Sequence, residues 1–123
     1  MLKLTKCKKS FVYALKGLNY TFRREQNFRI EIFIALLMVA AMFFFGLRNS
    51  EKVVVMLLIT FILALEMFNT IIERFLDLLK PRLDDQVKVL KDIMAGAVLL
   101  ASLGSLIIGF MIFYPYIFEI IFK

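Results

Sequence analysis

Four polar side chains interrupt an apolar stretch that reads ALEMFNTIIERFLD: Glu66, Asn69, Glu73 and Asp77. At about 100° per helical residue they fall within an arc of roughly 80°, so they share one face of a helix. A charged side chain in a membrane span costs roughly 2.5 to 3.5 kcal/mol, so this stripe predicts a protein-lined or wet site with a function. The alternative is that Glu66 and Asn69 only bond neighbouring helices together.

Depth in the membrane separates the expected roles of these groups. The apolar run begins at Val53, which places Glu66 about 20 Å from the outer boundary of the bilayer. A carboxylate at that depth can act as general base towards a lipid hydroxyl. Glu73 lies about 10 Å nearer the cytosol, where a carboxylate can hold a hydrated metal ion.

A further carboxylate, Glu25, precedes the first apolar run, and it is predicted to meet Glu73 at the inner surface. The chain has no His and one Cys, so a metal here must rely on carboxylate oxygens, which suit Mg²⁺ bridging nucleotide phosphates. Lys91 can offset phosphate charge. The alternative for Glu25 is an ion pair with Arg29, one helical turn away. Asp92 follows Lys91 at the start of the third span, where an acidic residue can simply favour the N-terminus of a helix.

These groups need helices that cross a membrane. The chain has 123 residues, of which 62% are hydrophobic, which argues against a soluble fold. Its apolar runs predict three spans at about 27–47, 53–75 and 92–118, within a single membrane-embedded domain covering 1–123. The predicted fold is all-α.

An amphipathic segment is expected ahead of the first span, at about 8–24. Its apolar side chains recur at helical spacing: Phe11, Ala14, Leu15, Leu18 and Phe22. Basic side chains recur on the other side: Lys9, Lys16 and Arg23. This pattern predicts a helix lying at the membrane surface. A solvated helix packed on a partner would show the same stripe.

The distribution of charge predicts orientation. Residues 1–29 hold eight Lys and Arg and residues 74–92 hold five, so thirteen of the sixteen are expected on the cytoplasmic side. The N-terminus is then cytoplasmic and the C-terminus lies outside. The net charge of +6 is typical of contact with an anionic membrane leaflet, and no nucleic acid partner is expected. Lys16 and Arg23 interrupt the N-terminal stretch, so no signal peptide is expected.

The chain has neither a GxxxxGK[ST] loop nor the glycine-rich loop of protein kinases, so phosphoryl transfer would need another site design. The run ALEMFNTIIERFLD, followed fourteen residues later by KDIMAGAVL, resembles the signature of the prokaryotic diacylglycerol kinase and undecaprenol kinase family. The upstream pieces YALKGL and EQNFRIE occur in the order that the family shows. The resemblance covers nearly the whole chain.

This resemblance implies a homotrimer in the bacterial inner (plasma) membrane, with active sites between protomers. It implies transfer of the γ-phosphoryl group of ATP to a membrane lipid alcohol, with Mg²⁺. Glu66 resembles the catalytic base, Glu25 and Glu73 the metal-binding carboxylates that also serve the nucleotide, and Lys91 with Asp92 the nucleotide-contacting pair. The resemblance places Lys6 and Tyr13 where the family contacts ATP. The positions expected to support the substrate or the active site are Asn69, Asp77 and Arg29.

Two departures from common family patterns bear on specificity. The second loop reads Arg82, Leu83 and Asp84 where many members carry an acidic residue and a His, so nucleotide contacts there are expected to differ. The AGAVL sequence after Asp92 resembles undecaprenol kinases more than diacylglycerol kinases, which favours undecaprenol as acceptor. The alternatives left open are a non-enzymatic small membrane subunit and an inactive family member.

Overall fold

Helices make up nearly all of the described chain. The computed structural model describes residues 3–82 and 84–122. Its four helices are α1 (Leu4–Arg24), α2 (Gln26–Phe44), α3 (Asn49–Leu79) and α4 (Asp84–Ile121). The last three are long and apolar enough to cross a membrane. The all-helical, three-span prediction is therefore confirmed.

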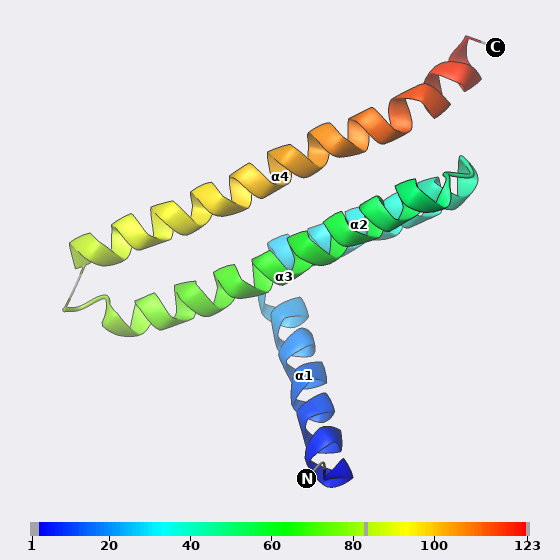
Figure 1. The fold of residues 1–123 in the computed structure, drawn as a ribbon. Coiled ribbons are helices and arrows are strands. Elements are labelled where there is room, and N and C mark those ends of the chain that lie inside the picture. The colour runs from blue at the N-terminus through cyan, green and yellow to red at the C-terminus, as the bar shows by residue number, and fades with distance from the viewer. Residues whose placement is uncertain (1–2, 83, 123) are drawn as a thin grey trace.

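The three long helices run alongside one another, and α1 leaves them sideways (Figure 1). α3 packs against both α2 and α4, and α1 contacts α2. α1 joins α2 beside the middle of α3, so the last turns of α3 and the first turns of α4 extend past it.

The corner between α1 and α2 is built around Glu25. Its backbone is extended, with φ −112° and ψ 111°, and its N–H donates to the Thr21 carbonyl at 2.9 Å. The Arg29 Nη1 atom donates to the carbonyls of Phe22 and Arg23, at 2.9 Å each. These bonds satisfy carbonyls that the end of α1 leaves free, so the corner holds its direction.

The turn between α2 and α3 depends on Gly46, whose φ of +63° lies in the left-handed region. The Leu47 N–H donates to the Met42 carbonyl at 3.2 Å, which closes the end of α2 in the manner of a Schellman motif. Glu51 then accepts from the Arg48 N–H at 3.1 Å and caps the start of α3.

A small apolar core closes the end of the bundle at the turn between α2 and α3. Its buried members are Met42, Leu47, Val55 and Phe113. The ring of Phe45 lies edge-on to that of Phe113, with centroids 6.0 Å apart. Away from this core little of each span is buried within the chain, so lipid or further protein chains must cover the remaining apolar faces.

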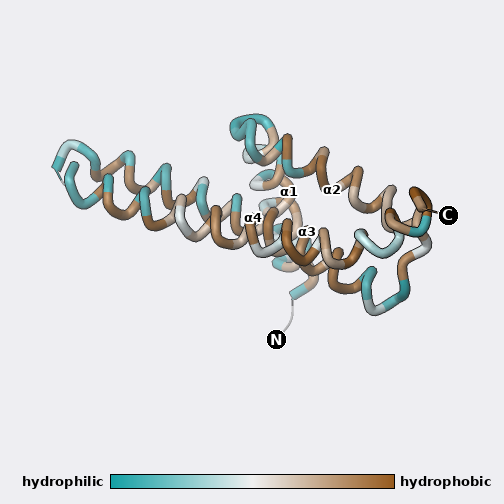
Figure 2. The backbone as a smooth tube through the Cα atoms, turned by 90° about the horizontal axis from the view of Figure 1, so that it is seen from above, coloured by the Kyte–Doolittle hydropathy of each residue, from teal (hydrophilic) through white to brown (hydrophobic). Residues whose placement is uncertain are grey.

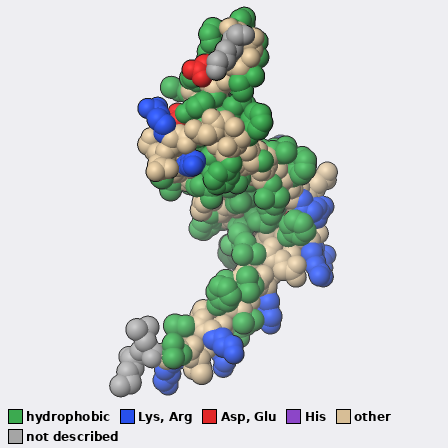
Figure 3. Space-filling model, turned by 90° about the vertical axis from the view of Figure 1, so that its right-hand side faces the viewer, with side chains coloured by type: hydrophobic (Ala, Val, Ile, Leu, Met, Phe, Trp, Pro, Cys, Tyr) green, Lys and Arg blue, Asp and Glu red, His purple; other side chains and the backbone are tan. Residues whose placement is uncertain are grey.

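Hydropathy follows this arrangement (Figure 2). Hydrophobic residues dominate the middle of the long helices, and hydrophilic ones gather where α3 meets α4 and along α1. The space-filling view shows Lys and Arg side chains in a row along α1, next to hydrophobic ones (Figure 3). α1 therefore has the two-sided character expected of a helix at a membrane surface.

The helices differ in extent from the segments expected from sequence. α1 begins at Leu4, earlier than 8, and α2 ends at Phe44 because the Gly46 turn takes up the residues to 47. α3 extends beyond 53–75 at both ends, and α4 begins well before 92. Charged residues at the ends of α3 and at the start of α4 interrupt the apolar runs of the sequence, but they are compatible with a helix. These two helices are therefore longer than the apolar runs from which they were predicted.

Candidate active site

Glu66 lies inside the bundle. It is 3% exposed, and its neighbour one turn on, Thr70, is 5% exposed. The Thr70 hydroxyl donates to the Glu66 backbone carbonyl at 3.1 Å, so that hydroxyl is satisfied within α3. The Glu66 side chain faces protein and not acyl chains, as the polar stripe predicted.

The rest of the stripe becomes more exposed towards the C-terminal end of α3. Asn69 and Glu73 are half-buried, and the Asn69 amide Nδ2 donates to Glu73 Oε1 at 3.4 Å. Asp77 is exposed and pairs with Lys91 of α4, with 2.7 Å between Oδ1 and Nζ. The stripe therefore runs from a buried carboxyl group to an ion pair that joins α3 and α4.

A carboxyl group that the sequence analysis did not single out, that of Glu31 on α2, faces Glu66. The two side chains lie near enough for the charge of each carboxyl group to act on the other. The Glu31 Oε2 atom is buried and has no hydrogen-bond partner among the described residues. The sequence does carry a signal for it, because Glu31 is an acidic residue within the predicted first span at 27–47.

Glu25, at the α1–α2 corner, binds Arg74 of α3, with 3.5 Å between Oε1 and Nη2. The alternative pairing of Glu25 with Arg29 is wrong, because the Arg29 guanidinium is used by the carbonyls that end α1. Glu25 and Glu73 both lie near enough for their charges to act on Glu66. The corner and the stripe thus bring three carboxylates to one region.

Carboxylate oxygens of Glu25 and Glu73 have the donor chemistry that Mg²⁺ prefers. No group of three or more His, Cys, Asp or Glu side chains is placed to hold a metal ion within the described residues. Mg²⁺ usually takes only one or two carboxylates and completes its shell with water and substrate phosphates. The residues present therefore fit a nucleotide-bound Mg²⁺ better than a protein-only metal cage.

Lys6 and Tyr13 lie apart from this region. Both are exposed on α1, and Lys6 is separated from Glu25 by most of the helix, about 28 Å at 1.5 Å per residue. The Tyr13 ring contacts the Lys16 ammonium, 5.7 Å from its centroid. Asp92 is exposed in the N-terminal part of α4. A single chain does not bring Lys6 and Tyr13 to the carboxylates.

One family model and several known proteins are similar to this chain. The family model for prokaryotic diacylglycerol kinase matches residues 12–113. Undecaprenol kinase of Bacillus subtilis is 37% identical over 107 residues, which is 87% of each chain. Diacylglycerol kinase of Synechocystis is 34% identical over 107 residues, 86% of this chain and 61% of that protein.

Diacylglycerol kinase of Haemophilus influenzae is 32% identical over 74 residues, 60% of this chain and 63% of that protein. No solved structure matches the chain. The two 107-residue matches have similar identity to proteins with different named acceptors, so they do not resolve the acceptor.

Proposed function

The chain belongs to the prokaryotic diacylglycerol kinase family of membrane lipid kinases, and we propose that its carboxylate cluster transfers the ATP γ-phosphoryl group to a membrane lipid alcohol. The observation that supports this assignment of the site is the burial of Glu66, with Glu25 and Glu73 near enough for their charges to act on it. In the proposed orientation these two carboxylates lie on the aqueous side. A lipid hydroxyl and a cytosolic nucleotide can both reach such a place.

In the proposed reaction a Glu66 carboxylate oxygen takes the proton of the lipid hydroxyl. The hydroxyl oxygen forms a bond to the γ-phosphorus as the bond from that phosphorus to the bridging oxygen of ADP breaks. Mg²⁺ held with Glu25 and Glu73 would neutralise phosphate charge. Lys91 lies across from α3 and supplies a further positive charge, while positioning provides much of the acceleration.

Undecaprenol is the proposed acceptor in preference to diacylglycerol. The proposal rests on the AGAVL sequence at 95–99, which follows Lys91 and Asp92 and resembles the form in undecaprenol kinases. The product would serve cell-envelope lipid-carrier metabolism, and a diacylglycerol acceptor would instead serve phospholipid metabolism.

A homotrimer is the proposed active form. Lys6 and Tyr13, proposed to contact ATP, lie far along α1 from the carboxylates of their own chain. A neighbouring chain can bring its α1 to the site, and the large exposed apolar faces of the spans leave room for such packing. The N-terminus and the loop between α3 and α4 would face the cytoplasm under the positive-inside rule.

The test is phosphoryl transfer by purified protein in vesicles. Wild type, E66Q and the matched control E119Q receive radiolabelled ATP, Mg²⁺ and an equal mixture of undecaprenol and diacylglycerol, and the lipid products are separated by thin-layer chromatography. Glu119 is exposed near the end of α4, so it is a carboxylate outside the site. We expect labelled undecaprenyl phosphate from wild type and E119Q.

E66Q is expected to lose at least about a hundredfold in rate, because it cannot accept the proton. Undiminished transfer by E66Q would eliminate the proposed base. Labelled phosphatidic acid alone would overturn the acceptor assignment and leave the lipid kinase assignment intact.

A further inference from the structure

Arg74 of α3 lies next to both carboxylates that are proposed to hold the metal ion. It follows Glu73 directly in the chain, and its Nη2 atom lies 3.5 Å from Glu25 Oε1 at the corner between α1 and α2. The proposed reaction gives this guanidinium no role. A cation at that place nevertheless acts on anything that binds to Glu25.

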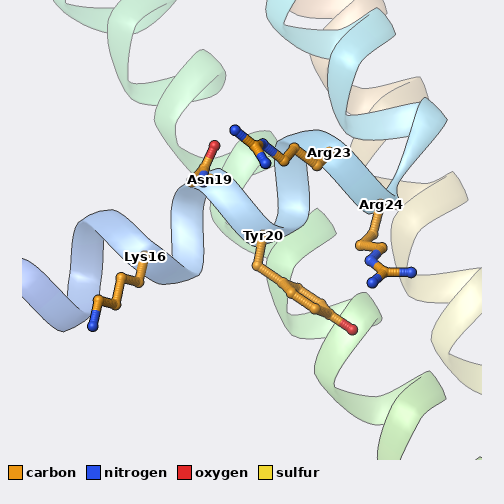
Figure 4. A pocket seen from close by; sticks show the side chains of 5 residues that line it. All are labelled: Lys16, Asn19, Tyr20, Arg23 and Arg24. Carbon is orange, nitrogen blue, oxygen red and sulfur yellow. The ribbon is translucent and has the colours of Figure 1, made fainter.

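The Arg74 guanidinium also contacts Tyr20 of α1. Its carbon lies 5.9 Å from the centroid of the Tyr20 ring, and that of Arg24 lies 5.7 Å from the same centroid. Figure 4 shows Tyr20 and Arg24 on one side of α1 and Arg23 on the other. An aromatic ring attracts a cation weakly and leaves its charge in place. Tyr20 therefore helps to keep Arg74 beside Glu25 without neutralising it.

The pair of Arg74 and Glu25 is weak enough to exchange partners. The Arg74 side chain is 53% exposed, and the distance of 3.5 Å is longer than that of an ordinary hydrogen bond. Ion pairs with so much solvent contribute little, a factor of about five at most in an equilibrium constant. A ligand that offers the guanidinium more negative charge can therefore draw it away from Glu25.

We infer that Arg74 couples metal binding to nucleotide binding by exchanging Glu25 for nucleotide phosphate. This inference rests on the proposed function, in which Glu25 and Glu73 hold the nucleotide-bound metal ion. A guanidinium and a divalent cation compete for the same Glu25 oxygen, so Arg74 weakens metal binding when no nucleotide is bound. Phosphate oxygens accept paired hydrogen bonds from a guanidinium. With nucleotide bound, Arg74 turns to the phosphates and leaves Glu25 free to bind the metal ion.

A purely structural ion pair makes a different prediction. If Arg74 only tied α3 to the corner, its removal would loosen Glu25 and weaken the binding of metal and nucleotide alike. If Arg74 exchanges partners, its removal strengthens the binding of metal alone and weakens the binding of nucleotide. The two effects of one substitution then have opposite signs, and neither measurement needs phosphoryl transfer.

The test measures both equilibria on the full chain in phosphatidylcholine nanodiscs without a lipid alcohol. Binding of Mn²⁺ alone, in place of Mg²⁺, is followed by the loss of the electron paramagnetic resonance signal of free Mn²⁺. Binding of a non-hydrolysable ATP analogue at saturating Mn²⁺ is followed by equilibrium dialysis. For R74Q we expect the Kd of Mn²⁺ to fall about three- to fivefold. We expect the Kd of the analogue to rise about tenfold, because a charged hydrogen-bond donor to phosphate is lost.

Two further variants separate the place of Arg74 from its charge. R23Q removes a guanidinium from an exposed position on the other side of α1, and the salt bridges among the described residues do not use Arg23. Both Kd values of R23Q should stay within twofold of wild type. R74K keeps the charge but lacks the planar pair of donors, so its Kd values should lie between those of wild type and R74Q.

Substitution of Glu25 identifies the partner that Arg74 leaves. E25Q should weaken the binding of Mn²⁺ together with the analogue. Adding R74Q to E25Q should not strengthen the binding of Mn²⁺ alone, because the competition for the Glu25 carboxylate is already absent.

The exchange and the metal site fail in different ways. If R74Q does not lower the Kd of Mn²⁺, or does not raise that of the analogue, while E25Q still weakens their joint binding, the exchange is overturned and the proposed metal site stands. If E25Q leaves the joint binding of Mn²⁺ and the analogue unchanged, the metal site is overturned and the exchange with it.

Discussion

The carboxyl groups of Glu31 and Glu66 face each other from α2 and α3, although like charges repel strongly where water is scarce. Because it faces Glu66, the Glu31 side chain limits where the proposed base can lie. At the residue scale, Glu31 is thus a candidate positioning residue, and Glu66 is the group that would touch the lipid hydroxyl.

We predict that E31Q lowers kcat roughly tenfold, a loss typical of removing a group that orients a reactive one, and smaller than the loss in E66Q. The measurement is steady-state lipid phosphorylation at saturating ATP. E119Q again serves as the control. Wild-type kcat in E31Q would show that the Glu31 carboxylate does not orient the base.

Lys91 forms an ion pair with Asp77 and is also proposed to contact the nucleotide. Substitutions at the two positions separate these two roles of Lys91. The Asp77 side chain is 52% exposed, so the pair is expected to contribute no more than about 1 kcal/mol to stability. We predict that K91Q raises the KM for ATP several-fold, whereas D77N, which frees Lys91, does not. Equal effects of the two substitutions on KM would indicate that only the ion pair matters.

At the scale of elements, the α2–α3 turn depends on one backbone conformation. A Cβ at Gly46 would meet nothing within 4 Å, so the cost of G46A is strain from its positive φ, about 1 to 2 kcal/mol. We expect a lower Tm in detergent for G46A, measured by circular dichroism. The matched control is G17A, in the interior of α1, where alanine also meets nothing within 4 Å and favours the helix. Its Tm should stay equal or rise.

The corner at Glu25 is an element with a functional consequence. It ends α1, begins α2 and presents a carboxylate towards Arg74 of α3. The same corner sets the level at which α1 leaves the bundle, and the last turns of α3 and the first turns of α4 extend past that level (Figure 1). The proposed nucleotide side of the site therefore depends on where one helix stops.

At the scale of the whole molecule, the separation of α1 from the carboxylates leads to a complementation test. We predict that K6A/Y13A chains and E66Q chains, each nearly inactive alone, recover activity when they assemble together. If α1 and Glu66 of a site come from different chains, random mixing leaves about one quarter of the sites intact. Lipid phosphorylation is measured after mixing in detergent and reconstitution.

A matched control mixes K6A/Y13A chains with chains that carry both defects, K6A/Y13A/E66Q, which can build no intact site. No recovery in the first mixture, with assembly of both chains shown by two affinity tags, would contradict sites shared between protomers.

The sequence was sufficient for the three candidate spans, the helix ahead of them and the polar face of α3. Each follows from local patterning, because an apolar run must cross a membrane as a helix and because residues spaced 3, 7 and 11 apart share a helix face whatever surrounds it. Family membership also followed from separated motifs, and the family comparison agrees.

Tertiary structure decided which carboxylates meet. The partner of Glu25 is Arg74, 49 positions away, and the carboxyl group facing Glu66 is Glu31, on another helix. Helix periodicity gives the direction of a side chain about its own axis, but not the height and rotation at which two helices pack. Those depend on the sum of many side-chain contacts between α2, α3 and α4, which no local pattern in the sequence contains.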